Sequence, residues 1–188
     1  TKRASDLIKD VFKCKKADVY FLTGGTITNK ILIAHCLKPF EAVISADSGH
    51  IHVHETGAIE ATGHKVLIVN NRDGKVTADE VEQLFVKHTD EHMVKPKMLY
   101  ISNPTEYGTI YSLSELKNLY DICKKLNMYL YVDGARLACA LMANDNNIQA
   151  SDLTKYVDAF YIGGTKNGLM MGEALVIIKY KVKEEFRN

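Results

Sequence analysis

The sequence has little of what a membrane protein, a secreted protein or a nucleic-acid-binding protein needs. No uninterrupted apolar run approaches the ~18 residues of a membrane-spanning helix. The first residues, Thr1-Lys-Arg-Ala-Ser5, lack the apolar core of a signal peptide. The 24 basic and 23 acidic residues give a formal net charge of +1, so neither nucleic acid nor a membrane surface is expected as a partner. The chain begins without Met, and we expect it to start inside a longer protein.

Paired cysteines and the common nucleotide-binding glycine motifs are also missing. Cys14, Cys36, Cys123 and Cys139 are widely separated and form no C-x-x-C pair. This spacing favours free thiols in a reducing compartment, and we expect the cytoplasm. Neither the P-loop pattern nor the dinucleotide-binding pattern G-x-G-x-x-G is present.

What the sequence does contain is a regular alternation of short apolar segments and amphipathic segments. Its 188 residues, 46% of them hydrophobic, suffice for one domain with a sizeable core. Strands are expected at 18–22, 41–45, 65–69, 97–102, 129–133, 159–163 and 172–178. Helices are expected at 5–14, 27–37 and 50–62, after the capping boxes Thr77-Ala-Asp-Glu80 and Ser112-Leu-Ser-Glu115, and from about Arg136.

This alternation predicts the fold class. Strands separated by helices form right-handed crossovers, which make neighbouring strands parallel. The last two expected strands are joined by only a short glycine-rich loop, which favours one antiparallel pair. The sequence therefore predicts the α/β class, as a three-layer α/β/α large domain with a mostly parallel, mixed sheet.

Polar residues follow two of the expected strands at their carboxyl ends. Asp133 ends one strand, with Arg136 three residues later, and Lys166 follows another strand within Gly-Gly-Thr-Lys. Ligands of open α/β sheets bind at this edge, so the three side chains could share one crevice. Purely structural interpretations stay open. Asp133 could cap a helix, Arg136 could merely pair with Asp133, and Lys166 could be either an exposed loop lysine or a partly desolvated nucleophile.

Two further segments are candidates for a site. Thr23-Gly-Gly-Thr26 stands between a strand and a helix, where it could cradle a phosphate or simply form a turn and helix cap. His50-Ile-His-Val-His54 could place three imidazoles on one face of a strand and bind zinc. On a helix these histidines could instead lie at the surface, or one ring could serve a cofactor.

These motifs occur in a definite order, namely glycine-rich turn, histidine, Asp-x-x-Arg and lysine. In that order the chain resembles the threonine aldolase branch of the β-eliminating lyase family. These are pyridoxal 5'-phosphate enzymes of the aspartate aminotransferase fold. The matching stretches are Gly24-Gly-Thr-Ile-Thr-Asn29, Asp47-Ser-Gly-His-Ile-His-Val-His-Glu-Thr-Gly57, Val132-Asp-Gly-Ala-Arg136 and Gly163-Gly-Thr-Lys166.

The resemblance implies a role for each matching residue. Lys166 would bind the cofactor covalently through its amine, and Asp133 would pair with the pyridine nitrogen so that the ring accepts electrons. His50 would stack on the cofactor ring and assist catalysis. Arg136 would lie beside the cofactor and the substrate carboxylate. The phosphate would be held by Gly25 and Thr26.

Two departures from the family pattern affect these expectations. Many threonine aldolases carry a histidine where Pro104-Thr-Glu106 has Glu106, so the general base could be His50, Glu106 or water. The family also continues into a small C-terminal domain, whereas this sequence stops at Asn188. Residues 1–188 are therefore expected to be the cofactor-binding large domain, incomplete at both ends.

The resemblance implies an aldolase that cleaves threonine, or a related β-hydroxy-α-amino acid, to glycine and an aldehyde. A homodimer or homotetramer is expected on the same ground. The alternatives are another pyridoxal phosphate lyase of the β-eliminating family, an inactive cofactor-binding fragment, and a metal hydrolase that uses the histidine run.

Overall fold

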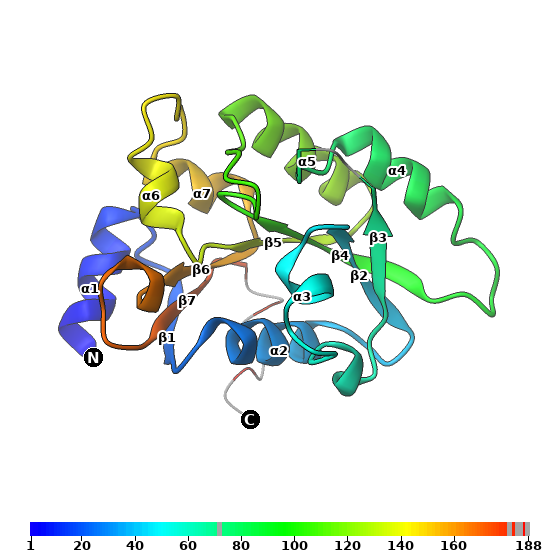
Figure 1. The fold of residues 1–188 in the computed structure, drawn as a ribbon, viewed down its shortest axis with the longest axis horizontal. Coiled ribbons are helices and arrows are strands. Elements are labelled where there is room, and N and C mark those ends of the chain that lie inside the picture. The colour runs from blue at the N-terminus through cyan, green and yellow to red at the C-terminus, as the bar shows by residue number, and fades with distance from the viewer. Residues whose placement is uncertain (71–72, 180–181, 183–185, 187–188) are drawn as a thin grey trace.

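The computed structural model describes residues 1–70, 73–179, 182 and 186. Within these residues, seven strands form one sheet that is covered by helices on both faces (Figure 1). The strands are β1 (Asp18–Leu22), β2 (Glu41–Ala46), β3 (Val66–Val69), β4 (Lys95–Ser102), β5 (Tyr129–Asp133), β6 (Ala159–Gly163) and β7 (Glu173–Ile177). All seven expected strands are confirmed, with small changes at their ends.

The strand order across the sheet is β1-β7-β6-β5-β4-β2-β3. The run from β6 to β3 is parallel throughout. Strand β7 runs antiparallel to both of its neighbours, β6 and β1, which confirms the predicted antiparallel pair. Six strands therefore point the same way, and their carboxyl ends form one edge of the sheet.

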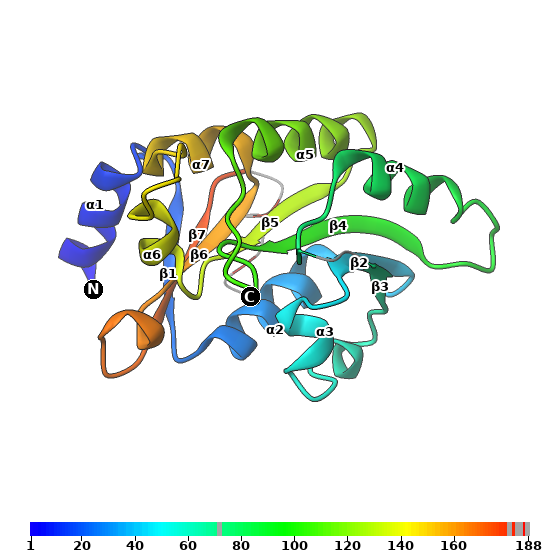
Figure 2. The same cartoon turned by 45° about the horizontal axis from the view of Figure 1, so that its top comes forward.

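Two layers of helices sandwich the sheet, as Figure 2 shows after rotation. One face carries α1 (Lys2–Val11), α4 (Ala78–Val86), α5 (Leu113–Lys125), α6 (Leu137–Leu141) and α7 (Ala150–Tyr156). The other face carries α2 (Gly25–Cys36), the short α3 (His50–Val53) and the 3-10 turn η1 (Glu60–Thr62). The predicted three-layer α/β/α class is confirmed.

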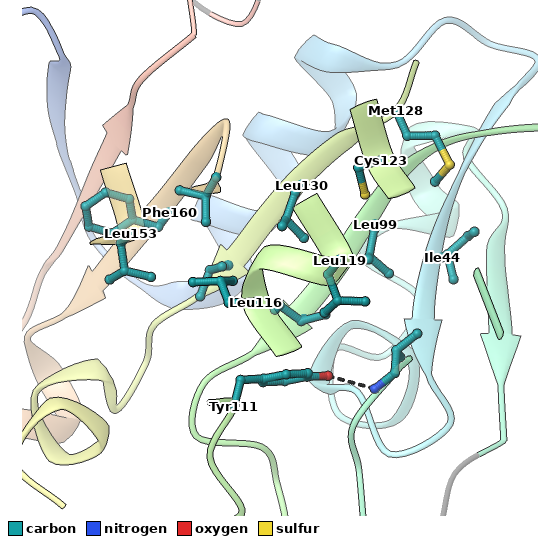
Figure 3. Close-up of a cluster of buried hydrophobic side chains, with 14 of the residues drawn as sticks. Ile44, Leu99, Tyr111, Leu116, Leu119, Cys123, Met128, Leu130, Leu153 and Phe160 are labelled. Atoms are coloured by element: carbon teal, nitrogen blue, oxygen red, sulfur yellow. Dashed lines mark hydrogen bonds between the residues drawn. The ribbon is translucent and has the colours of Figure 1, made fainter. Parts of the chain in front are cut away.

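Each face of the sheet has its own apolar core. Under α5, Leu116 and Leu119 pack over the sheet residues Leu99 and Leu130, and all four are buried (Figure 3). On the opposite face Leu32 of α2 is buried against sheet side chains. Because residues on both faces of the central strands are buried, these strands read in the sequence as continuous apolar runs.

Two expected helices differ from the structure. The segment 50–62 is not one helix, because it breaks after α3 at Thr56 and Gly57, which take positive φ angles of 49° and 75°. Such left-handed backbone cannot continue an α-helix. The helix expected from about Arg136 is short, and a separate helix, α7, precedes β6. Both capping boxes are confirmed at the starts of α4 and α5.

The four cysteines are free thiols, as expected. Among the residues that the structure describes, no helix combines the length and apolar character needed to cross a membrane.

Candidate active site

A pocket of about 230 Å³ opens at the carboxyl edge of the sheet. Its walls come from the segments that follow β1, β2, β4, β5 and β6, and from the first residue of β7. The lining residues are Thr23, Gly24, Gly25, Thr26, His50, Glu106, Asp133, Ala135, Tyr161, Thr165, Lys166 and Glu173. Five of the six predicted site residues therefore meet in one place, and Arg136 lies just outside the lining.

A larger hollow of about 470 Å³ lies beside α1 and the turn that follows it. It is lined by Lys9, Asp10, Lys13, Cys14, Lys15, Lys16, Ala17, Thr154 and Ile178. None of the predicted site residues reaches it. We therefore place the candidate active site in the smaller pocket, where the chemically competent side chains converge.

Gly25 and Thr26 form the first turn of α2 at one end of the pocket. The backbone N–H groups of a first helical turn have no partner within the helix and favour an anion. A Cβ atom at Gly25 would come within 2.9 Å of the hydroxyl oxygen of Tyr161. Glycine at this position therefore keeps the helix start close to β6.

Asp133 is buried and accepts hydrogen bonds from neutral donors. Its Oδ2 atom accepts from the hydroxyl of Tyr100 at 2.5 Å and from the amide of Asn29 at 3.1 Å, and its Oδ1 accepts from the backbone N–H of Ala135 at 3.0 Å. Burial, and next the charge of Asp133, raise the pKa of Tyr100 well above the ordinary 10.0, so its hydroxyl keeps its proton. Asp133 does not cap α6, whose N-terminus carries no side-chain cap.

The hydrogen bonds continue from Asp133 to His50. Asn29 donates a second amide hydrogen to Glu55 Oε1 at 2.8 Å, and the same oxygen contacts His50 Nδ1 at 2.9 Å. The hydroxyl of Tyr131 donates to Asn29 Oδ1 at 2.8 Å. The hydrogen bond to Glu55 raises the pKa of His50 above its ordinary value, against the opposing effect of burial.

Lys166 reaches the pocket but differs from one expectation. It lies in the 3-10 turn η2 (Thr165–Asn167) just after β6, and it is exposed rather than desolvated. Gly168 takes a φ of 93° and leads the chain into an exposed loop that does not cover the lysine. The turn is held by Asn167, whose side-chain amide donates to the carbonyl oxygens of Ala135 and Gly163 at 3.0 and 2.7 Å.

Arg136 pairs with Glu106 rather than with Asp133. The distance from Nη1 of Arg136 to Oε2 of Glu106 is 3.8 Å, and the guanidinium side chain is 42% exposed. Arg136 therefore stands at the rim of the pocket, while Glu106 lines it. The suggestion that Arg136 serves only to neutralise Asp133 is wrong.

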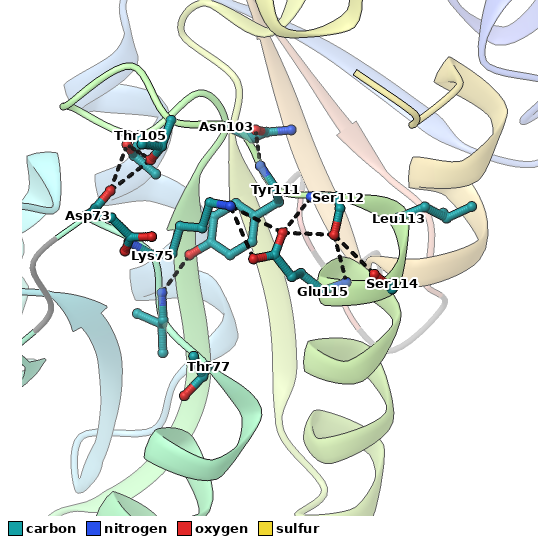
Figure 4. A network of polar contacts seen from close by, with 12 residues as sticks. Asp73, Lys75, Thr77, Asn103, Thr105, Tyr111, Ser112, Leu113, Ser114 and Glu115 are labelled. Atoms are coloured by element: carbon teal, nitrogen blue, oxygen red, sulfur yellow. Dashed lines mark hydrogen bonds and ion pairs between the residues drawn. The ribbon is translucent and has the colours of Figure 1, made fainter. Parts of the chain in front are cut away.

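The loop that carries Glu106 is fastened to the loop before α4 (Figure 4). The hydroxyl of Thr109 donates to the carbonyl oxygen of Asp73 at 2.7 Å, and the backbone N–H of Val76 donates to the hydroxyl of Tyr111 at 2.7 Å. Lys75 lies over the Tyr111 ring and pairs with Glu115 of α5 at 3.1 Å. These contacts hold the segment that follows Glu106 against the loop before α4.

The histidine run does not form a strand. His50 and His52 lie on α3 and His54 ends it, so the three imidazoles do not share one strand face. His50 is partly buried, whereas His52 and His54 are exposed. In the part of the chain that the structure describes, no group of three or more His, Cys, Asp or Glu is arranged to hold a metal ion.

Sequence reasoning missed the buried partners of the site, above all Asn29, Glu55 and Tyr100. A signal for the tyrosines was present. Tyr100, Tyr131 and Tyr161 each stand two residues before the end of a strand, and alternate residues of a strand share a face. All three side chains lie on the face that carries α2. Asn29 and Glu55 gave no comparable signal, because they come from segments that meet only in the fold.

The chain is similar to proteins of one known family. The family model "Beta-eliminating lyase" matches residues 1–187. The chain is 33% identical over 192 residues to a low specificity L-threonine aldolase of Pseudomonas aeruginosa. The aligned region covers 99% of this chain and 54% of that protein. The chain is 27% identical to the enzyme of that name from Escherichia coli, over 92% of this chain and 51% of the relative.

A solved structure of Leishmania major threonine aldolase superposes with a TM-score of 0.97 at 46% identity, over 99% of this chain and 54% of that one. Mouse CSAD superposes with a TM-score of 0.74 at 15% identity and shares the fold. The chain thus spans about half the length of the relatives it matches.

The fold and these relatives define the class first: the chain has the fold of the pyridoxal phosphate enzymes of fold type I. More narrowly, the chain belongs to the beta-eliminating lyase family, whose members depend on pyridoxal phosphate.

The residues of the pocket fit that cofactor. Among the described residues no lysine, arginine or histidine forms an ion pair with buried Asp133, so a protonated ring nitrogen would find an unneutralised carboxylate there. The amine of Lys166 lines the same pocket, and the start of α2 offers backbone donors to a phosphate.

Proposed function

We propose that this protein is a pyridoxal phosphate-dependent aldolase that cleaves threonine, or a related β-hydroxy-α-amino acid, to glycine and an aldehyde. The observation that carries the proposal is the convergence of Lys166, Asp133 and His50 with the start of α2 in one pocket. Relatives named low specificity L-threonine aldolase support the choice of reaction. On this proposal residues 1–188 are the cofactor-binding large domain.

The roles we propose follow from what each side chain offers. Lys166 supplies the amine that binds the cofactor covalently, and the carboxylate of Asp133 holds a proton on the ring nitrogen. Gly25 and Thr26 hold the phosphate, and Arg136 at the rim binds the carboxylate of the amino acid. When bound, the cofactor supplies the electron sink that makes cleavage of the Cα–Cβ bond possible.

His50 is the base we propose for the substrate hydroxyl. The ring lines the pocket together with Asp133 and Lys166, and its Nε2 atom would take the hydroxyl proton directly or through water. General-base help of this kind is typically worth ~10²- to 10⁴-fold in rate. Glu106, which also lines the pocket, is the alternative base, and kinetic measurements on variants distinguish the two residues.

Assay of the purified protein with threonine tests the reaction. We expect release of glycine and acetaldehyde, together with a visible absorbance of the bound cofactor that borohydride removes. Lys166→Ala should lose both signals. Clear cofactor absorbance without aldehyde release, but with formation of a keto acid and ammonia, would instead support another lyase of the same family.

Two properties of the whole protein belong to the same proposal. Four free thiols support a reducing compartment, and we propose the cytoplasm.

We also propose a homodimer or homotetramer. Leu169, Met170 and Met171, in the exposed loop beside Lys166, support a covering partner because they leave a run of apolar surface. Light scattering with size-exclusion chromatography measures this directly, and a monomer would overturn it.

A further inference from the structure

The ring of His50 is held at one nitrogen and free at the other. Nδ1 lies 2.9 Å from Glu55 Oε1. A carboxylate can only accept hydrogen bonds, so the ring hydrogen in this contact is on Nδ1. A neutral ring then carries its lone pair on Nε2, which makes no hydrogen bond with the described residues. The side chain is 24% exposed and lines the pocket.

Glu55 is entirely buried and depends on this contact. Its side chain has an exposed fraction of 0%, and its second oxygen, Oε2, accepts no hydrogen bond from the described residues. Within those residues, His50 is the one group able to carry positive charge that contacts Glu55. A buried carboxylate with so little compensation attracts the charge of a protonated imidazole strongly.

Asn29 fixes Glu55 in place and connects it to Asp133. An amide has two hydrogens on its nitrogen, and Asn29 Nδ2 donates to Glu55 at 2.8 Å and to Asp133 at 3.1 Å. Tyr131 donates to Oδ1 of Asn29. A flipped amide would turn its oxygen toward two carboxylates and lose both hydrogen bonds to them. Burial is the main cause that raises the pKa of Tyr131, which therefore remains a donor.

Several charged groups face His50 from the elements packed around it. Besides Glu55, the carboxylates of Asp133 and Glu106 raise its pKa. The ring of His54 lies 5.5 Å away between centroids. Lys166 and Glu173 line the same pocket, and Arg136 is paired to Glu106. Glu55 has a direct hydrogen bond to the ring, and that bond has the largest influence on the pKa of His50.

We propose that Glu55 is a positioning residue for the reaction: with Asn29 it holds His50 in the tautomer whose Nε2 faces the pocket as a proton acceptor. Asn29 passes the same constraint to Asp133, so that one amide connects the two pocket residues His50, through Glu55, and Asp133. Glu55 itself is entirely buried and does not line the pocket. The catalytic consequence rests on the proposed function, whereas the tautomer does not.

Nuclear magnetic resonance of protein labelled with ¹⁵N in its histidine rings tests the tautomer without cofactor or substrate. We expect His50 to carry its hydrogen on Nδ1 and to titrate above the ordinary value of 6.5. Glu55→Gln keeps an acceptor but removes the charge, so the tautomer should persist while the pKa falls to 6.5 or below. Glu55→Leu should lose both effects.

Glu41→Gln is the matched control, because Glu41 is also buried and accepts a hydrogen bond, from the backbone N–H of Lys38. It should leave His50 unchanged. A hydrogen on Nε2 in the unmodified protein would overturn the proposal without any variant. So would an unchanged titration of His50 in Glu55→Gln, which is nearly isosteric and decides the matter if Glu55→Leu fails to fold.

A pH profile of kcat/KM then tests the catalytic consequence. Glu55→Gln keeps the tautomer but leaves Nε2 less basic, so kcat/KM should fall by about 10-fold, which is less than the ~10²- to 10⁴-fold contribution of a complete general base. The acid limb of the profile should move to lower pH together with the titration of His50. A lowered rate with an unmoved acid limb would reject the positioning role. Absence of aldolase activity in the unmodified protein would reject the proposed function and leave the tautomer result standing.

Discussion

The hydroxyl of Tyr100 on β4 donates a hydrogen bond of 2.5 Å to Asp133 Oδ2 on the neighbouring strand β5. Both residues are buried, with exposed fractions of 1% and 3%. A hydrogen bond to a charged group is worth more than one between neutral groups, and its loss leaves a buried carboxylate short of a donor. This contact therefore combines a structural and an electrostatic role.

Tyr100→Phe keeps the ring and removes the hydroxyl, which donates to Asp133 and also accepts a hydrogen bond of 3.3 Å from the hydroxyl of Ser102. We expect the free energy of unfolding to fall by about 1.5–3 kcal/mol, measured by urea denaturation. Tyr120→Phe is the control, because the Tyr120 hydroxyl makes no hydrogen bond with the described residues, and it should change stability by less than about 0.5 kcal/mol. Equal losses in the two variants would show that Asp133 is satisfied without Tyr100.

At the start of α2, the close approach of the Tyr161 hydroxyl should make any side chain larger than that of Gly25 unfavourable. Gly25→Ala places a Cβ atom 2.9 Å from the Tyr161 hydroxyl, and the next carbon of that ring lies 3.6 Å away, which is ordinary contact. We expect a loss of about 1–3 kcal/mol in stability from overpacking. In the Tyr161→Phe background the clashing oxygen is gone, so Gly25→Ala should cost much less. A cost that is the same in both backgrounds would mean that the Tyr161 hydroxyl is not what requires glycine.

Much of this architecture could be predicted because it rests on local patterns. The strand ending at Asp133 is a buried apolar run, and the helices after Thr77 and Ser112 begin at capping boxes, so periodicity and capping chemistry suffice. The helix expected over 50–62 was wrong because its composition suits a helix, yet the backbone turns left-handed at Thr56 and Gly57.

The residues of the site also fall into those that the sequence could identify and those that it could not. Asp133 and Lys166 were found because they stand at or just after the carboxyl ends of strands, and His50 because it begins a run of histidines. The resemblance to a family then ordered them. Asn29 and Glu55 could not be found from the sequence. Along the chain Asn29 is 26 positions from Glu55 and 104 from Asp133, and a buried amide between two carboxylates has no local signature.

The His50–Glu55 pair predicts how stability depends on pH. The hydrogen bond to Glu55 raises the pKa of His50 in the folded state above the ordinary 6.5 of the unfolded chain. The folded state therefore binds a proton more tightly, and this contribution is fully present below pH 6.5 and is lost as pH rises through the folded pKa.

Urea denaturation at a series of pH values measures this dependence. The decrease in unfolding free energy from below pH 6.5 upward should be steeper in the unmodified protein than in Glu55→Gln. The remaining histidines are common to both proteins, so they cancel in the difference. Parallel curves would show that the pair does not contribute to stability.

Glu106 provides the test that separates the two candidate bases. Its carboxylate pairs with Arg136 at 3.8 Å, where the guanidinium is 42% exposed, and such partly exposed pairs are worth about 0–1 kcal/mol. Glu106→Gln frees Arg136 for the carboxylate of an amino acid. We expect KM to fall by at most about 5-fold, the equivalent of 1 kcal/mol, while kcat changes less than about 10-fold because His50 keeps its role as base.

Steady-state kinetics of Glu106→Gln, with the exposed Glu91→Gln as control, distinguishes the outcomes. Glu91 lies away from the pocket beside His92, and its substitution should leave both constants unchanged. If Glu106 were the base, kcat would instead collapse by ~10²- to 10⁴-fold, whatever the change in KM. A raised KM with kcat intact would mean that Glu106 orients Arg136 for the substrate rather than competing with it. The direction of the KM change thus shows whether Glu106 helps or hinders substrate binding by Arg136. The size of the kcat change shows whether His50 or Glu106 is the base.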